Sequence, residues 1–150
     1  MIRWTAADVH VRNVEGWLAE FGYETWRAGI EFPRCWRPLL FERLGDFCRW
    51  WPDFGARGPA GLLWVDAKAD TLDSANYAIE LAALNCYQMI ELRLRHAVVV
   101  AFPNRVGNYV HDLEPTRVES NPRANGSGTA YALFRKDAQR PLVEILGGGQ

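Results

Sequence analysis

The stretch PDFGARGPAGLLWVDAK, residues 52–68, combines a tight turn with two aspartates and a lysine near its ends. Gly58-Pro59-Ala60-Gly61 predicts the turn, because proline presets φ at the first turn position and glycine tolerates the flanking strain. Counting outward from the Pro59–Ala60 bond pairs position 58 with 61 and, further out, Asp53 with Asp66. We therefore expect a β-hairpin whose two legs bring Asp53 and Asp66 face to face.

Two carboxylates directly opposite on paired strands have Cβ atoms roughly 5 Å apart, and like charges there are destabilising. A divalent cation would offset this repulsion, because hard cations bind clustered carboxylate oxygens. Lys68 lies two residues beyond Asp66, so strand alternation places both side chains on one face. Asp53, Asp66 and Lys68 therefore predict a metal-dependent site for phosphodiester chemistry.

Composition sets the broad class of protein. The chain has 150 residues, 49% of them hydrophobic and 23% charged, which is typical of one globular domain with a sizeable core. The sequence has no long apolar run and no leader-like N-terminus, so we expect a cytoplasmic protein without a membrane anchor. Three scattered cysteines argue against a disulfide framework or a zinc site.

The formal net charge of −1 does not by itself indicate a nucleic-acid partner. The charge is unevenly distributed, however, because residues 93–140 carry eight basic side chains against four acidic ones. This local excess is compatible with phosphate contacts.

Periodicity predicts the remaining elements. Residues 8–21 have apolar side chains at helical spacing and a cap at Thr5 or Asp8, and residues 71–95 predict a long helix capped by Thr71 or Ser74. Strands are predicted at 23–26, 47–54, 62–68, 97–102 and 129–134, an extended segment at 109–118, and an irregular or partly helical insertion at 33–43. A strand, a long helix and a further strand favour a crossover that joins two parallel strands.

This order of elements resembles the core of the PD-(D/E)XK nuclease superfamily over roughly residues 8–102. The resemblance is carried by Pro52-Asp53, by Asp66-Ala67-Lys68 and by Gln88 on the following helix. It implies an α/β protein with a restriction-endonuclease-like core, in which helices flank a central mixed sheet in the order αβββαβ. We expect a single domain over residues 1–150, with an exposed loop near 120–128 and a frayed tail at 147–150.

The resemblance also implies roles for individual residues. Asp53 and Asp66, together with the backbone carbonyl of Ala67, would hold Mg²⁺ or Mn²⁺. Lys68 would position the attacking water or stabilise charge on the phosphate. Gln88 would serve as an auxiliary polar group.

Many members of the superfamily complete the metal site with a glutamate from the first helix. In this chain the candidates are Glu15, Glu20 and Asp8. We prefer Glu15, because it flanks the predicted buried face of that helix. Without such a carboxylate the metal site would have fewer ligands than usual.

The function implied by the resemblance is endonucleolytic cleavage of DNA, on branched or junction DNA as in Holliday-junction resolvases or phage and mobile-element endonucleases. A four-way junction has two symmetric cleavage positions, so a homodimer is expected. Trp36, Trp50 and Trp51 are candidates for a dimer face or for stacking on bases, although core packing is the simpler expectation for them.

Two other interpretations stay open. The chain could be a nuclease-fold DNA-binding module without catalysis, or a protein–protein interaction module, which near-neutral charge and 13% aromatic residues would suit. Gln88 and Glu80 are more simply explained as part of a solvated helix face. His10, His96 and His111 show no ligand spacing, so surface or packing roles are expected for them.

Overall fold

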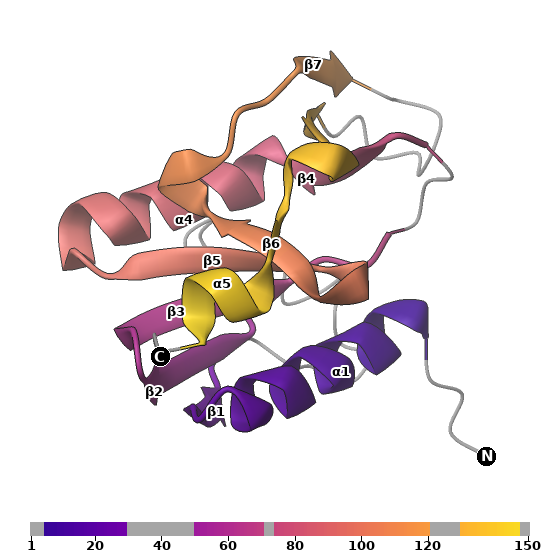
Figure 1. The fold of residues 1–150 in the computed structure, drawn as a ribbon. Coiled ribbons are helices and arrows are strands. Elements are labelled where there is room, and N and C mark those ends of the chain that lie inside the picture. The colour runs from indigo at the N-terminus through magenta and orange to yellow at the C-terminus, as the bar shows by residue number, and fades with distance from the viewer. Residues whose placement is uncertain (1–4, 30–49, 71–73, 121–129, 148–150) are drawn as a thin grey trace.

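The computed structural model describes residues 5–29, 50–70, 74–120 and 130–147. A six-stranded mixed sheet in the order β1-β2-β3-β5-β6-β9 forms the centre, and a three-stranded sheet in the order β4-β8-β7 lies beside it. Figure 1 shows α4 on one side of the central strands and α1 on the other. The elements are α1 (Ala6–Glu20), β1 (Glu24–Arg27), β2 (Phe54–Gly58), β3 (Gly61–Ala67), β4 (Asn76–Glu80), α4 (Leu81–Leu94), β5 (Ala97–Phe102), β6 (Val106–Tyr109), β7 (Arg117–Ser120), β8 (Ala130–Arg135), β9 (Arg140–Pro141) and α5 (Leu142–Leu146).

The predicted hairpin is confirmed with its register. Gly58 pairs with Gly61, Arg57 with Leu62, and the ladder continues to the pair Phe54 and Val65. Gly61 has φ of +92°, a conformation that glycine adopts without the penalty of a Cβ. The next step of this register places Asp53 opposite Asp66 at the end of the hairpin.

The crossover is also confirmed. β3 and β5 are parallel, with Asp66 paired to Val100, and the connection between them contains α4. The central sheet therefore follows the expected order αβββαβ, with β4 added before α4 as part of the second sheet. Among the described residues, no helix is both long and apolar enough to span a membrane.

The prediction of one helix from Thr71 to Arg95 is wrong in its first part. Residues 76–80 form β4, with an alternating burial pattern, and the helix begins at Leu81. The reason is tertiary, because β4 pairs with β8 from the distant C-terminal part of the chain. Ser74 does not cap the helix but bonds the backbone of Asn76, and Thr71 lies outside the described residues.

The strand predicted at 47–54 is wrong for residues 50–53, because β2 begins only at Phe54. Residues 109–118 are not one extended segment, since a 3₁₀ turn occupies Val110–Asp112. The helix at 8–21 and the strands at 23–26, 97–102 and 129–134 are confirmed within one or two residues. The insertion at 33–43 and the loop residues 121–128 lie outside the described part of the chain.

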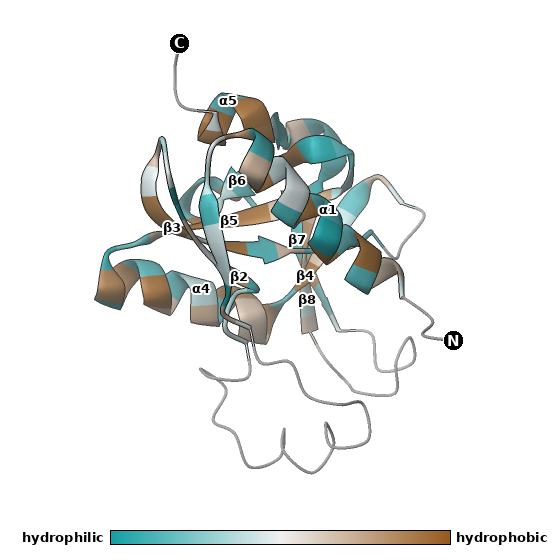
Figure 2. Ribbon diagram, turned by 90° about the horizontal axis from the view of Figure 1, so that it is seen from below, coloured by the Kyte–Doolittle hydropathy of each residue, from teal (hydrophilic) through white to brown (hydrophobic). Residues whose placement is uncertain are grey.

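Two apolar clusters hold the helices against the sheet. One contains Tyr87 and Ile90 of α4 with Val98 and Val100 of β5. The other lies on the opposite face and joins α1 and α5 to the sheet through residues such as Val14, Leu18, Val65, Val99 and Leu142. The helices that cover the sheet accordingly combine hydrophobic and hydrophilic positions (Figure 2).

The start of α1 matches its sequence signal. Thr5 and Asp8 form a capping box, in which each side chain bonds the other residue's backbone N–H. This fixes Asp8 at the helix cap.

Candidate metal-binding site

Asp53 sits at the entrance to β2, where its side chain reaches across to β3. Its Oδ2 accepts the backbone N–H of Ala67 at 2.9 Å, and its own carbonyl oxygen accepts the N–H groups of Ala28 and Gly29. Pro52, directly before it, has no N–H to offer a strand ladder. The strand ladder ends at the pair Phe54 and Val65, and the bond from the Ala67 N–H to the Asp53 carboxylate holds Asp53 at the end of β3.

Asp66 is the last buried polar residue of β3, with only 5% of its surface exposed. Among the described residues its Oδ2 has no hydrogen-bond partner, although Lys68 lies nearby. A buried carboxylate oxygen without a hydrogen bond is costly unless something positive meets it. The oxygen is thus available to a cation.

Lys68 provides one positive charge beside this pair. Its Nζ lies 3.2 Å from Asp66 Oδ2 and 3.3 Å from Glu80 Oε2, and its backbone N–H donates to the Ala101 carbonyl. Burial alone would lower the pKa of Lys68, but Asp66, then Glu80 and Asp53, raise it above its ordinary value. Lys68 is therefore a fixed ammonium and not a proton carrier at neutral pH.

The strand register that places Asp53 opposite Asp66 also couples the charges of the two acids. Burial and the charge of Asp66 raise the pKa of Asp53 from 3.8 to about 8, against the opposing effects of the Ala67 N–H and Lys68. At neutral pH the pair therefore carries a proton. A divalent cation could replace that proton, because it would satisfy both carboxylates.

The helix α4 contributes Tyr87 to this site. Tyr87 is buried, and its pKa is raised well above 10.0 by burial and by the charge of Asp66. Lys68 Nζ lies 6.0 Å from the centre of its ring. Gln88, the residue singled out on this helix, is exposed instead.

The first helix does not bring its carboxylates to the pair. Glu15 is bonded by Arg27 at 2.8 Å with 44% of its side chain exposed, and Glu20 is bonded by Arg105 at 2.6 Å. Asp8 is engaged in the helix cap. The helix instead contributes His10 to the neighbourhood of the site.

His10 is buried, and its Nε2 donates to the Ala101 carbonyl at 3.0 Å, the same oxygen that accepts the Lys68 N–H. Burial lowers the pKa of His10, while the bond to Ala101 and the charge of Asp66 oppose that change. His10 therefore braces the strand end that carries Lys68. The sequence offered no spacing signal for it.

The expectation that Glu80 lies on a solvated helix face is wrong. Glu80 lies at the end of β4, and its Oε2 is buried and has no hydrogen-bond partner among the described residues. The alternation of buried Tyr77 and Ile79 is the signal that could have identified this strand.

The donor set fits a hard cation that keeps several waters. Two carboxylates and the carbonyl of Ala67 lie at one strand end, and oxygen ligands of this kind suit Mg²⁺ or Mn²⁺. Within the described residues, no three His, Cys, Asp or Glu side chains gather in a metal-binding group. A cation held here would thus depend on Asp53 and Asp66.

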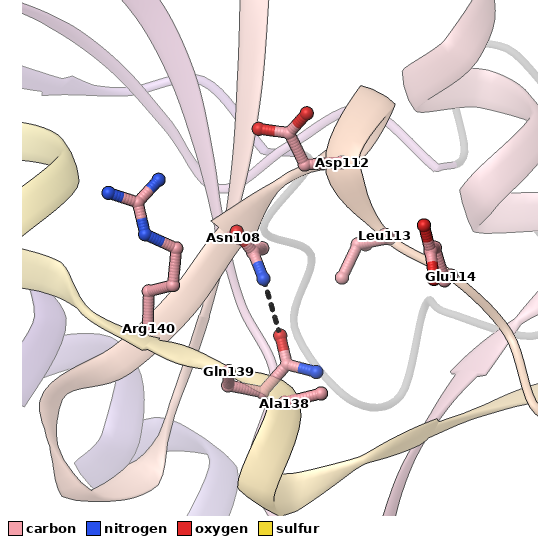
Figure 3. Close-up of a pocket in the computed structure, with 7 residues that line it drawn as sticks. All are labelled: Asn108, Asp112, Leu113, Glu114, Ala138, Gln139 and Arg140. Atoms are coloured by element: carbon pink, nitrogen blue, oxygen red, sulfur yellow. Dashed lines mark hydrogen bonds between the residues drawn. The ribbon is translucent and has the colours of Figure 1, made fainter.

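A separate hollow of about 330 Å³ is lined by Asn108 of β6, by residues 112–114 and by residues 138–140 (Figure 3). None of the predicted site residues lines it. Asn108 lines it and donates to Gln139 Oε1 at 3.2 Å. Of the tryptophans considered for a dimer face, Trp50 and Trp51 are half-buried and pack against the apolar cluster under α4. Trp36 lies outside the described residues.

Taken together, the mixed sheet, the flanking helices and the order of elements define a restriction-endonuclease-like α/β fold. The sequence matches no protein-family model, and it matches no curated protein. Among solved structures, the chain is similar to Hjc, a Holliday junction resolvase from the archaeon Archaeoglobus fulgidus, with a TM-score of 0.59. The match covers 97% of this chain and 99% of Hjc at 12% sequence identity, so it establishes the fold.

Proposed function

We propose that this protein is a metal-dependent endonuclease that hydrolyses DNA phosphodiester bonds, with branched or junction DNA as its substrate. The observation that carries the proposal is the pairing of Asp53 and Asp66 beside Lys68, with a buried Asp66 oxygen that lacks a hydrogen bond. The full-length fold similarity to a Holliday junction resolvase supports the substrate class. A homodimer suits a substrate with two symmetric cleavage positions.

The proposed roles follow from the donor atoms. Asp53, Asp66 and the Ala67 carbonyl would hold Mg²⁺ or Mn²⁺, which when bound acidifies water and polarises a phosphoryl oxygen. Lys68 offers a permanent ammonium that would stabilise negative charge developing on the phosphate.

A second candidate is a nuclease-fold protein that binds DNA, or another protein, without cutting. It is favoured by the positions of Glu15 and Glu20, which are both bonded to arginines away from the acid pair. With a third carboxylate missing, the site could bind a cation too weakly for catalysis. Metal binding separates the two functions.

The test is a cleavage assay with Mn²⁺ or Mg²⁺ on supercoiled, single-stranded and four-way-junction DNA. We compare the wild type with Lys68→Met and with the double variant Asp53→Asn/Asp66→Asn. Glu144→Gln is the control, since this exposed carboxylate on α5 has only a 3.9 Å contact with Arg140. Cleavage that requires the metal and is lost in both site variants supports the proposal.

One combination of results would contradict the nuclease proposal. A wild type that cuts none of the three DNA forms, and that binds Mn²⁺ no better than Asp53→Asn/Asp66→Asn, contradicts the nuclease proposal. Retained DNA binding that weakens steeply with salt would then favour the non-catalytic DNA-binding module.

A further inference from the structure

We propose that Glu80 is a positioning residue for Lys68, and that it retains the lysine ammonium when a cation takes over Asp66. This inference rests on the proposed function and deepens it. It concerns a residue from the second sheet, outside the hairpin that carries the acid pair.

The contacts of Lys68 are nearly symmetrical. Its Nζ lies 3.2 Å from Asp66 Oδ2 and 3.3 Å from Glu80 Oε2. Both oxygens are buried, and within the described part of the chain neither has a hydrogen-bond partner. One ammonium is therefore shared between two carboxylates that have no other strong donor at these atoms.

The backbone around Glu80 explains how it reaches Lys68. Glu80 ends β4, pairs with Tyr131 of β8 and occupies the N-cap position of α4. A side chain at this position commonly caps the helix, but that of Glu80 makes no capping bond. Its carboxylate turns toward Lys68 instead, at 26% exposure.

Because Lys68 contacts both Asp66 and Glu80, it does not depend on Asp66 alone for a counter-ion. If Asp66 were the only counter-ion of Lys68, a cation and the ammonium would compete for the same oxygen. With Glu80 present, the cation can take Asp66 Oδ2 while Lys68 stays paired.

The first experiment compares Glu80→Gln with Glu144→Gln in single-turnover cleavage at saturating Mn²⁺, together with direct titration of Mn²⁺ binding. We expect Glu80→Gln to lower the cleavage rate about 10- to 100-fold, as outer partners of a metal site typically do, while KM for DNA is unchanged. Mn²⁺ affinity should stay close to that of the wild type. Loss of Mn²⁺ binding equal to that of Asp66→Asn would overturn the inference, because Glu80 would then be a ligand.

The second experiment does not depend on activity. Urea midpoints are measured for wild type, Glu80→Gln, Lys68→Met and the double variant without metal. If Glu80 acts through Lys68, the midpoint shift caused by Glu80→Gln is more positive in the Lys68→Met background than in the wild type. In the Lys68→Met background the Glu80 carboxylate has lost its partner, so removing its charge relieves a cost. Equal midpoint shifts in both backgrounds would overturn the inference. A wild type that cuts no DNA would instead overturn the proposed nuclease function, which keeps the two failures distinct.

Discussion

Replacing Asp53 with asparagine should stabilise the folded protein at alkaline pH. The pKa of Asp53 is raised from 3.8 to about 8 by burial and by Asp66. Well below pH 4 the carboxyl group is protonated in both the folded and the unfolded chain, so it does not affect the free energy of unfolding. Between pH 4 and pH 8 only the unfolded chain releases the proton, and the folded state loses stability as pH rises.

The magnitude follows from the same pKa. A tenfold change in proton affinity is worth about 1.4 kcal/mol, so a rise from 3.8 to about 8 has a limiting cost of about 6 kcal/mol above pH 8. Asparagine avoids this cost and keeps a side-chain oxygen that can accept the Ala67 N–H. We expect Asp53→Asn to be about 2 to 5 kcal/mol more stable than wild type at pH 9, with almost no difference at pH 4.

The assay is urea unfolding from pH 4 to pH 9 in the presence of a chelator, for wild type, Asp53→Asn and the exposed control Glu144→Gln. The chelator is needed because a bound cation would favour the ionised carboxylates and hide the effect. A difference between wild type and Asp53→Asn that stays constant across this range would refute the reasoning. So would an Asp53→Asn protein that is less stable at every pH.

Three further outcomes are expected. Millimolar Mg²⁺ or Mn²⁺ should raise the melting temperature of the wild type, more at pH 8 than at pH 6, and Asp66→Asn should abolish this rise in a thermal melt. His10→Gln should flatten the loss of stability on acidification below pH 6.5, because burial lowers the pKa of His10 and only the unfolded chain protonates there; an unchanged slope in urea unfolding would contradict this. Gly107→Ala should destabilise the fold by about 3 kcal/mol or more in urea unfolding, because its Cβ would lie 2.2 Å from the Val100 carbonyl oxygen; a cost below about 1 kcal/mol would show that β6 can shift.

The hairpin was predictable because its determinants are local. The Gly-Pro-Ala-Gly turn fixes which residues pair, and residue counting then carries the register outward to Phe54 and Val65. Asp53 lies just outside the strand, yet its carboxylate still meets the end of β3 through the Ala67 N–H. Local turn chemistry therefore suffices to bring the two acids together.

The sequence could not identify which carboxylate of α1, if any, would reach the acid pair, and the reason is physical. Periodicity indicates which face of α1 is buried, but it cannot tell which polar residue at the edge of that face finds a surface partner. Glu15 bonds Arg27 of β1, and this contact depends on how β1 packs beside α1. His10, in contrast, lies on the buried side of α1 and donates to the carbonyl oxygen of Ala101 in β5.

A single error in the predicted secondary structure explains why Glu80 was assigned to a solvated helix face. A helix that began at Thr71 would place Glu80 in its middle, whereas pairing of β4 with β8 moves the helix start to Leu81 and leaves Glu80 at a strand end beside Lys68. The partner strand is distant in the sequence, so the local alternation over residues 76–80 can indicate a strand but cannot specify its pairing with β8. The acid pair is thus set by the hairpin, but the environment of Lys68 depends on a second sheet that forms only when the C-terminal strands return. Perturbing β8 should therefore affect the lysine before it affects the acids.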